Sequence, residues 1–135
     1  MKWDEQRDQL LAKAAEDLKA MLVLAADAGT SDATVGFHAQ QAVEKYLKAL
    51  ACHLRVDYER THDLVVLLDT ITDAGQPVPG DVDKCKYLQP YAVLFRYDNI
   101  AVGKQNPLNR STTQQDVECV RNWVMQIISK GVRHT

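Results

Sequence analysis

The sequence has 135 residues, of which 46% are hydrophobic and 25% are charged, the composition of an ordinary globular protein long enough to bury a core. A formal net charge of −2 argues against binding of nucleic acid through bulk positive charge, although a local basic patch stays open. The chain begins without the apolar core of a signal peptide, and no run approaches the length of a membrane span. We therefore expect one cytoplasmic domain over residues 1–135.

The first predicted helix covers residues 4–28, and Gly29 stands at the position just past its end. Its apolar face repeats at helical spacing and consists of Leu10, Leu11, Ala14, Leu18, Met21, Leu22 and Ala25. Thr30, Ser31 and Asp32 are candidate caps for a second helix that continues to about residue 54. This second helix has the strongest helical pattern in the chain.

The third predicted helix begins near residues 62–63 and ends before a break at residues 75–80, which contain two glycines and two prolines. A fourth helix starts at Asp81, and Pro90 should kink it because proline lacks a backbone donor. Residues 96–111 have no clear period, and a connection of that length is more often functional than idle. Thr112 or Thr113 caps the last helix, which reaches about Lys130.

Strand signals are weak throughout. The pattern predicts an all-α fold, an up-and-down antiparallel bundle of four long helices plus a short one. The three cysteines, Cys52, Cys85 and Cys119, lie far apart without a CxxC pair, which favours buried free thiols over a disulfide or metal framework. No Gly-rich phosphate loop, nucleophile elbow or metal-ligand cluster occurs, so we predict no cofactor and no metal.

The second helix has an unusual polar face beside its apolar stripe. His38, Gln41, Lys45 and Lys48 fall on this face, where an imidazole and amides accompany two cations one turn apart. Together with Gln40 they could bind a phosphate and a base edge, or form a polar dimer interface. The plain alternative is a solvated helix face.

Two further sites stand out. Thr61 or Asp63 could cap the third helix with His62 in its first turn, where a histidine is more often structural than catalytic. Arg96, Tyr97 and Asp98 end the fourth helix just before the long irregular segment. An arginine can bind phosphate in a bidentate manner and a tyrosine can stack on a base, whereas the plain alternative is an arginine paired with a carboxylate.

These segments resemble the HEPN-domain family over nearly the whole chain. The matching pieces are AEDL at residues 15–18, FHAQQAVEK at 37–45, THDL at 61–64 and Arg-Tyr at 96–97. The resemblance implies a compact helical bundle, commonly a homodimer, that works on nucleotides or RNA. It also implies a minimal nucleotidyltransferase as partner, often in a toxin–antitoxin pair.

Active nucleases of this family cleave RNA without a metal, using an arginine and a histidine separated by four to six residues. Arg96 matches the arginine, but residues 101–103 are Ala101, Val102 and Gly103, so the histidine of that mechanism is missing. The expected function is therefore a HEPN module that binds nucleotide or RNA through the residues above or docks a nucleotidyltransferase. The alternatives are a metal-independent ribonuclease using Arg96 with His38 or His62, and a purely structural interaction protein.

Overall fold

The computed structural model describes residues 2–94 and 107–132, and within these ranges every regular element is a helix. The elements in chain order are α1 (Lys2–Ala25), α2 (Asp32–His53), α3 (Leu64–Asp73), α4 (Gly80–Asp83), the 3₁₀ helix η1 (Lys84–Leu88), α5 (Tyr91–Leu94) and α7 (Arg110–Val132). The predicted antiparallel all-α fold is confirmed. Residues 96–98, which the sequence analysis singled out, lie outside the described residues.

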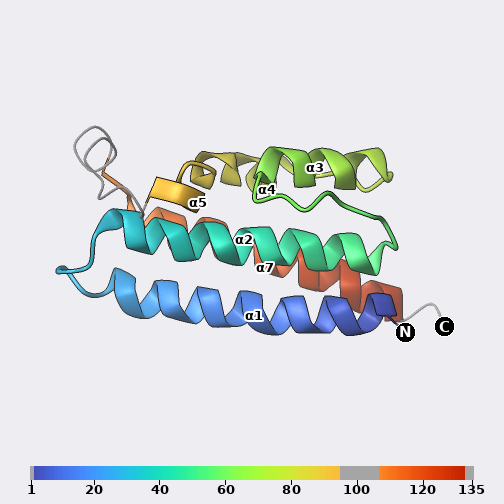
Figure 1. Ribbon diagram of the computed structural model, residues 1–135, viewed down its shortest axis with the longest axis horizontal. Helices are drawn as coiled ribbons and strands as arrows, with labels where there is room; N and C mark the ends of the chain where they lie inside the picture. Colours follow the sequence, from blue (N-terminus) through green and yellow to red (C-terminus); the bar gives the residue numbers. More distant parts are fainter. Residues whose placement is uncertain (1, 95–106, 133–135) are drawn as a thin grey trace.

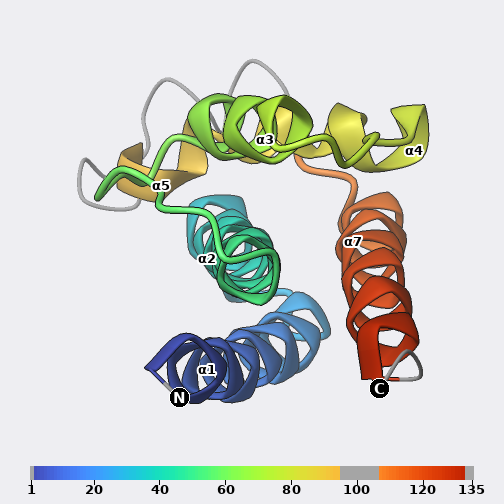
Figure 2. The same cartoon turned by 90° about the vertical axis from the view of Figure 1, so that its right-hand side faces the viewer.

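Helix α2 forms the centre of the bundle (Figure 1). Viewed end-on, α1 covers one side of α2 and α7 flanks both. Helices α3, η1 and α5 cover the opposite side of α2, and α4 lies over the end of α7 (Figure 2). Fourteen of the 22 residues of α2 are buried, so this helix contributes to the core on almost all sides. The expected apolar stripe was Ala39, Val43, Tyr46, Leu50 and Leu54. Its first four members are each at most 2% exposed, whereas Leu54 is half-buried just past the end of α2.

Local signals fix most of the helix boundaries. The Thr34 amide donates to the Ser31 side chain at 3.1 Å, so Ser31 caps α2. Asp63 caps α3 in the same way by accepting from the Val65 amide at 2.9 Å. Helix α1 ends at Ala25, three residues earlier than expected, and α7 begins at Arg110, ahead of the expected cap at Thr112 or Thr113.

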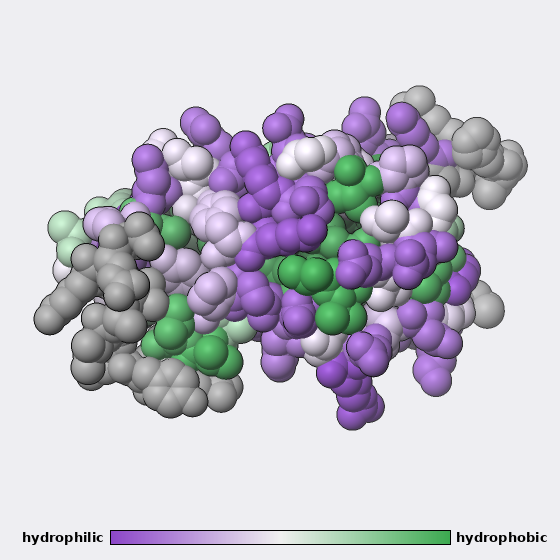
Figure 3. Space-filling model, turned by 90° about the horizontal axis from the view of Figure 1, so that it is seen from above, coloured by the Kyte–Doolittle hydropathy of each residue, from purple (hydrophilic) through white to green (hydrophobic). Residues whose placement is uncertain are grey.

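The helix expected from Asp81 onward is divided into α4, η1 and α5. Pro90 lies in the turn between η1 and α5, where its missing N–H ends the helical hydrogen bonding. Helix α5 packs closely on α2, because a Cβ atom placed on Gly36 would lie only 2.3 Å from the Tyr91 ring. The face of the molecule on the side of α3, α4 and α5 is mostly hydrophilic, and its hydrophobic side chains form separate patches (Figure 3).

Candidate functional site

A buried carboxylate on α2 organises the polar side chains of the site. Glu44 is 2% exposed. Four side chains contact it: Gln40 Nε2 at 3.1 Å, Gln41 Nε2 at 3.4 Å, Lys48 Nζ at 2.9 Å and His62 Nδ1 at 3.1 Å from each oxygen. We call these five residues the Glu44 network. Pairing of this kind offsets the cost of burying a charge.

The network arises from helical spacing. Gln40, Glu44 and Lys48 are four residues apart, so they share one face of α2. Gln40 Nε2 also donates to the His62 carbonyl oxygen at 3.0 Å. Backbone and ring of His62 are thus both held by α2 side chains, which fixes the end of the α2–α3 connector, residues 54–63, against the helix.

The position of His62 corrects one expectation. Because Asp63 is the cap and α3 begins at Leu64, His62 lies in the connector and not in the first turn of α3. Its side chain is 73% exposed while its partner Glu44 is buried. A carboxylate can only accept, so the proton of this hydrogen bond belongs to His62 Nδ1. The Glu44 carboxylate therefore holds the ring through Nδ1, and Nε2 has no hydrogen-bond partner among the described residues.

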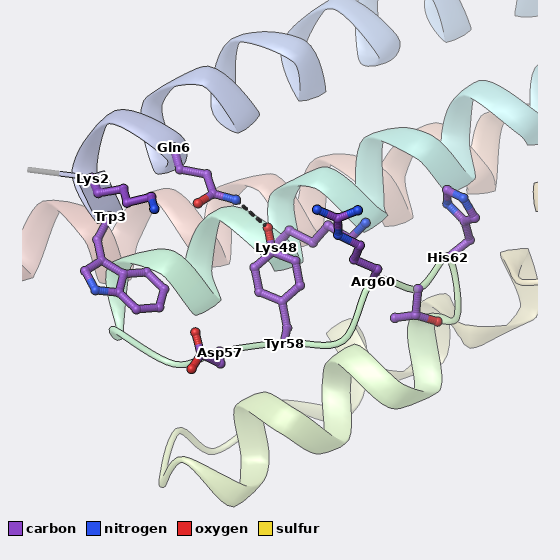
Figure 4. Close-up of a pocket in the computed structure, with 9 residues that line it drawn as sticks. Lys2, Trp3, Gln6, Lys48, Asp57, Tyr58, Arg60 and His62 are labelled. Atoms are coloured by element: carbon purple, nitrogen blue, oxygen red, sulfur yellow. Dashed lines mark hydrogen bonds between the residues drawn. The ribbon is translucent and has the colours of Figure 1, made fainter.

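A cavity of about 560 Å³ opens beside this network, between the first turns of α1, the C-terminal half of α2 and the connector (Figure 4). We call it the connector pocket. Its lining residues are Lys2, Trp3, Gln6, Lys48, Asp57, Tyr58, Arg60, Thr61 and His62. The size is that of a small-ligand site. Two of the sequence-predicted site residues, Lys48 and His62, are brought together here.

The charge of the pocket is mainly positive. Lys2, Lys48 and Arg60 line it against a single carboxylate, Asp57. The Lys48 ammonium lies 5.8 Å from the centre of the Tyr58 ring, within the range of a cation–π contact. These cations give the pocket the electrostatics of an anion-binding site.

Tyr58 forms the middle of the pocket wall (Figure 4). Its hydroxyl oxygen accepts from Gln6 Nε2 at 3.1 Å, which ties α1 to the connector. Burial raises the pKa of Tyr58, and the neighbouring Cys52 thiol and Glu44 carboxylate raise it further. The phenol therefore stays protonated at neutral pH and adds no negative charge to the pocket.

The polar face predicted on the second helix is divided into two groups. Gln41 and Lys48 belong to the Glu44 network, whereas His38 and Lys45 turn toward Asp17 on α1. His38 Nδ1 lies 3.0 Å from Asp17 Oδ1, and Lys45 donates to the other carboxylate oxygen. None of these side chains is fully exposed. The pairs with Asp17 join α1 to α2 and lie outside the connector pocket.

Sequence reasoning missed several residues of the site. Glu44 was not among the predicted site residues, although the i, i+4 series with Gln40 and Lys48 was a signal for a row of polar contacts. The α1 residues Lys2 and Trp3 gave no local sign of joining a site formed by residues 57–62.

The geometry defines the class: an all-α bundle with a cationic, aromatic-lined pocket against its central helix. The sequence model of the HEPN domain matches residues 8–134, so the chain belongs to the HEPN family. No curated protein and no solved structure matches the chain significantly. Among the helices of the described residues, none has the length and apolar character needed to cross a bilayer.

Proposed function

We propose that this HEPN protein binds a nucleotide or RNA in the connector pocket. The observation that supports this most is the lining of one cavity by Lys2, Lys48, Arg60 and His62 together with two aromatic rings. Cationic side chains bind phosphate oxygens through charge-assisted hydrogen bonds, and aromatic faces stack on bases. The pocket combines both within about 560 Å³.

Arg60 is the first choice as phosphate ligand. It is exposed, and no hydrogen bond or ion pair engages it in the part of the chain that the structure describes. Lys48 and His62 already contact Glu44, which holds them in place beside it. Arg96, Tyr97 and Asp98 remain proposed ligand residues, with Arg96 on phosphate and Tyr97 stacked on a base.

Equilibrium binding of ATP and of a labelled short RNA tests this proposal. Arg60→Met should weaken binding at least about tenfold, since hydrogen bonds to charged groups are worth about 1.5–3 kcal/mol. Lys19→Met is the matched control, because Lys19 is an exposed cation of α1 outside the pocket. Absence of binding by the unmodified protein would refute the proposal, and Arg96→Ala tests the second ligand group separately.

We also propose that the chain forms a homodimer and pairs with a minimal nucleotidyltransferase in a toxin–antitoxin system. Family membership supports this pairing. Light scattering on the purified chain should give twice the mass of the monomer, and a tagged chain should co-purify with a nucleotidyltransferase from its native cells. A monomer at all concentrations would contradict the first part, and recovery without such an enzyme would contradict the second.

The second candidate function is that of a metal-independent ribonuclease using Arg96 with His38 or His62. The position of His62 favours it, because Glu44 fixes Nδ1 and leaves Nε2 open for proton transfer. RNA cleavage in EDTA that His62→Ala abolishes and His38→Ala leaves intact would establish this function. Intact RNA after incubation with the unmodified protein would exclude it.

A further inference from the structure

The connector pocket has two chemically different ends (Figure 4). Trp3, Lys2 and Asp57 lie at one end, and His62 lies at the other, with Arg60 between it and the middle of the pocket. The half with His62 presents cations and hydrogen-bond donors without a carboxylate in its lining. The opposite end contains one cation and one carboxylate beside an indole ring. An elongated ligand with an anionic end and a flat, hydrogen-bonding end fits this polarity.

Lys2 and Asp57 are both available for a ligand. Each is exposed, and neither forms a hydrogen bond or ion pair with another residue in the described ranges 2–94 and 107–132. By contrast, Lys48 and His62 at the other half are held by Glu44. One half of the pocket is thus preorganised to bind an anionic group. The other half offers a donor, Lys2, and an acceptor, Asp57, that no protein group occupies in the described residues.

This pair distinguishes among bases. An ammonium group only donates and a carboxylate only accepts. Guanine presents an acceptor, O6, next to two donors, N1–H and the 2-amino group, along one edge. Adenine presents its 6-amino donor next to the N1 acceptor. In the same orientation the 6-amino donor would face the Lys2 ammonium, which is also a donor, and N1 would face the Asp57 carboxylate, which is also an acceptor. Lys2 and Asp57 together match the edge of guanine.

We propose that the connector pocket selects a guanine mononucleotide. Trp3 stacks on the base, Lys2 donates to O6, and Asp57 accepts from N1–H and the 2-amino group. The phosphate lies among Arg60, Lys48 and His62. This inference rests on the proposed nucleotide binding and adds base identity, orientation and the two residues that determine specificity.

Titration calorimetry of the full chain with GMP, IMP and AMP tests the inference. GMP should bind at least about fivefold more tightly than AMP, since a bidentate base contact is worth about 1–3 kcal/mol. IMP, which keeps O6 and N1–H but lacks the 2-amino group, should bind with intermediate affinity. Quenching of Trp3 fluorescence by GMP in the Trp123→Phe variant should report the stacked base, because Trp123 lies on α7 away from the pocket.

Variants separate specificity from affinity. Asp57→Asn should bring the GMP and AMP affinities within about threefold of each other, because one acceptor becomes a donor. Arg60→Met should weaken both nucleotides alike and keep their ratio. Glu59→Gln is the matched control, an exposed carboxylate of the same connector that does not line the pocket, and it should change neither affinity.

Four outcomes would overturn the inference. Equal affinities for GMP and AMP, or an unchanged ratio in Asp57→Asn, would refute guanine selection and leave nucleotide binding standing. Binding of a short RNA without binding of GMP would refute the mononucleotide and likewise leave the proposed function standing. Failure to bind any of these ligands would refute both proposals.

Discussion

Arg110 and Asp32 form an ion pair, with Nε 3.0 Å from Oδ1, that joins the first residue of α7 to the first residue of α2. The same carboxylate accepts from the Leu108 amide at 3.0 Å through its other oxygen. The Arg110 guanidinium also donates to carbonyl oxygens around the end of α1, those of Leu24, Ala25, Asp27 and Thr30. One side chain thus satisfies helix-terminal carbonyls that the helix itself cannot pair.

Replacement of this arginine should destabilise the bundle. Arg110→Met removes the ion pair and leaves partly buried carbonyl oxygens unpaired, which should lower the free energy of unfolding by about 2–3 kcal/mol in urea denaturation. Lys130→Met is the control, an exposed cation of the same helix. Equal stability of the two variants would show that solvent replaces the Arg110 contacts.

The buried carboxylate of α2 should be equally sensitive to substitution. Glu44→Ala leaves Lys48 and His62 without their shared partner and should cost about 2–3 kcal/mol of stability. Glu44→Gln keeps an acceptor oxygen and should cost less. Glu16→Ala, at an exposed position of α1, should change the unfolding midpoint very little. A loss in Glu16→Ala as large as that in Glu44→Ala would contradict a structural role of the network.

Gly36 should not tolerate a methyl group. Glycine-to-alanine changes inside helices usually stabilise by about 1 kcal/mol. Here the new Cβ would lie 2.3 Å from the Tyr91 ring, so we expect Gly36→Ala to destabilise by about 1–3 kcal/mol.

The origin of that loss can be tested with a second substitution. Adding Tyr91→Leu to Gly36→Ala should recover part of the stability, because the ring that meets the methyl group is gone. Gly80→Ala serves as the control, since a Cβ there meets nothing within 4 Å. A thermal midpoint of Gly36→Ala above that of the unmodified protein would contradict the close contact.

Stability should fall as the solution becomes acidic, in part because of His53. Burial lowers the pKa of His53 from 6.5, and the adjacent Arg7 and Arg55 guanidinium groups lower it further. Arg7 Nη1 lies 3.2 Å from His53 Nδ1, and since guanidinium only donates, this nitrogen must be unprotonated. The folded protein therefore favours the neutral ring.

The sign of the effect follows from proton linkage. The unfolded state binds the His53 proton near pH 6.5, whereas the folded state binds it only at lower pH. The contribution of His53 to the free energy of unfolding is therefore constant above about pH 7.5. It is lost as the pH falls through 6.5 toward the pKa of His53 in the folded state. Urea midpoints at pH 7.5 and 5.5 should differ less in His53→Gln than in the unmodified protein. An identical difference in both would refute this assignment.

The three thiols should differ in reactivity. Burial, with the nearby Asp83 and Asp116 carboxylates, raises the pKa of Cys85 to about 12, and burial also raises the pKa of Cys52. Since the thiolate is the reactive form, iodoacetamide at pH 8 should label the partly exposed Cys119 first. Mass spectrometry of the labelled peptides measures the order, and urea should abolish it. Labelling of Cys85 before Cys119 in the folded protein would contradict the burial.

Much of the fold could be predicted because its signals are local. Ser31 and Asp63 cap their helices through hydrogen bonds to amides two or three residues away. Gly75, in the predicted break, has a φ of 98°, a conformation that glycine adopts easily. The division of the region after Asp81 was not predicted, because the three-residue spacing of Val82, Cys85 and Leu88 fits an α-helix as well as a 3₁₀ helix.

The site could be predicted only in part because it depends on distant segments. Lys48 and His62 were expected, but the burial of Glu44 depends on a histidine 18 residues further along the chain. The end of the connector pocket proposed to hold the base is lined by Lys2 and Asp57, and no local sequence pattern indicates that these residues share a site. His38 and Lys45 were grouped with them by helical periodicity, yet Asp17 of α1 holds both on another side.

The shared contact of Lys48 and His62 with Glu44 makes their energetic contributions interdependent. Loss of either side chain leaves the other, with Gln40 and Gln41, as the remaining partner of a buried carboxylate, so the remaining residue is drawn more strongly inward and away from the pocket. The effects of removing Lys48 and His62 should therefore not add, and a thermodynamic cycle on the pair would measure their coupling directly.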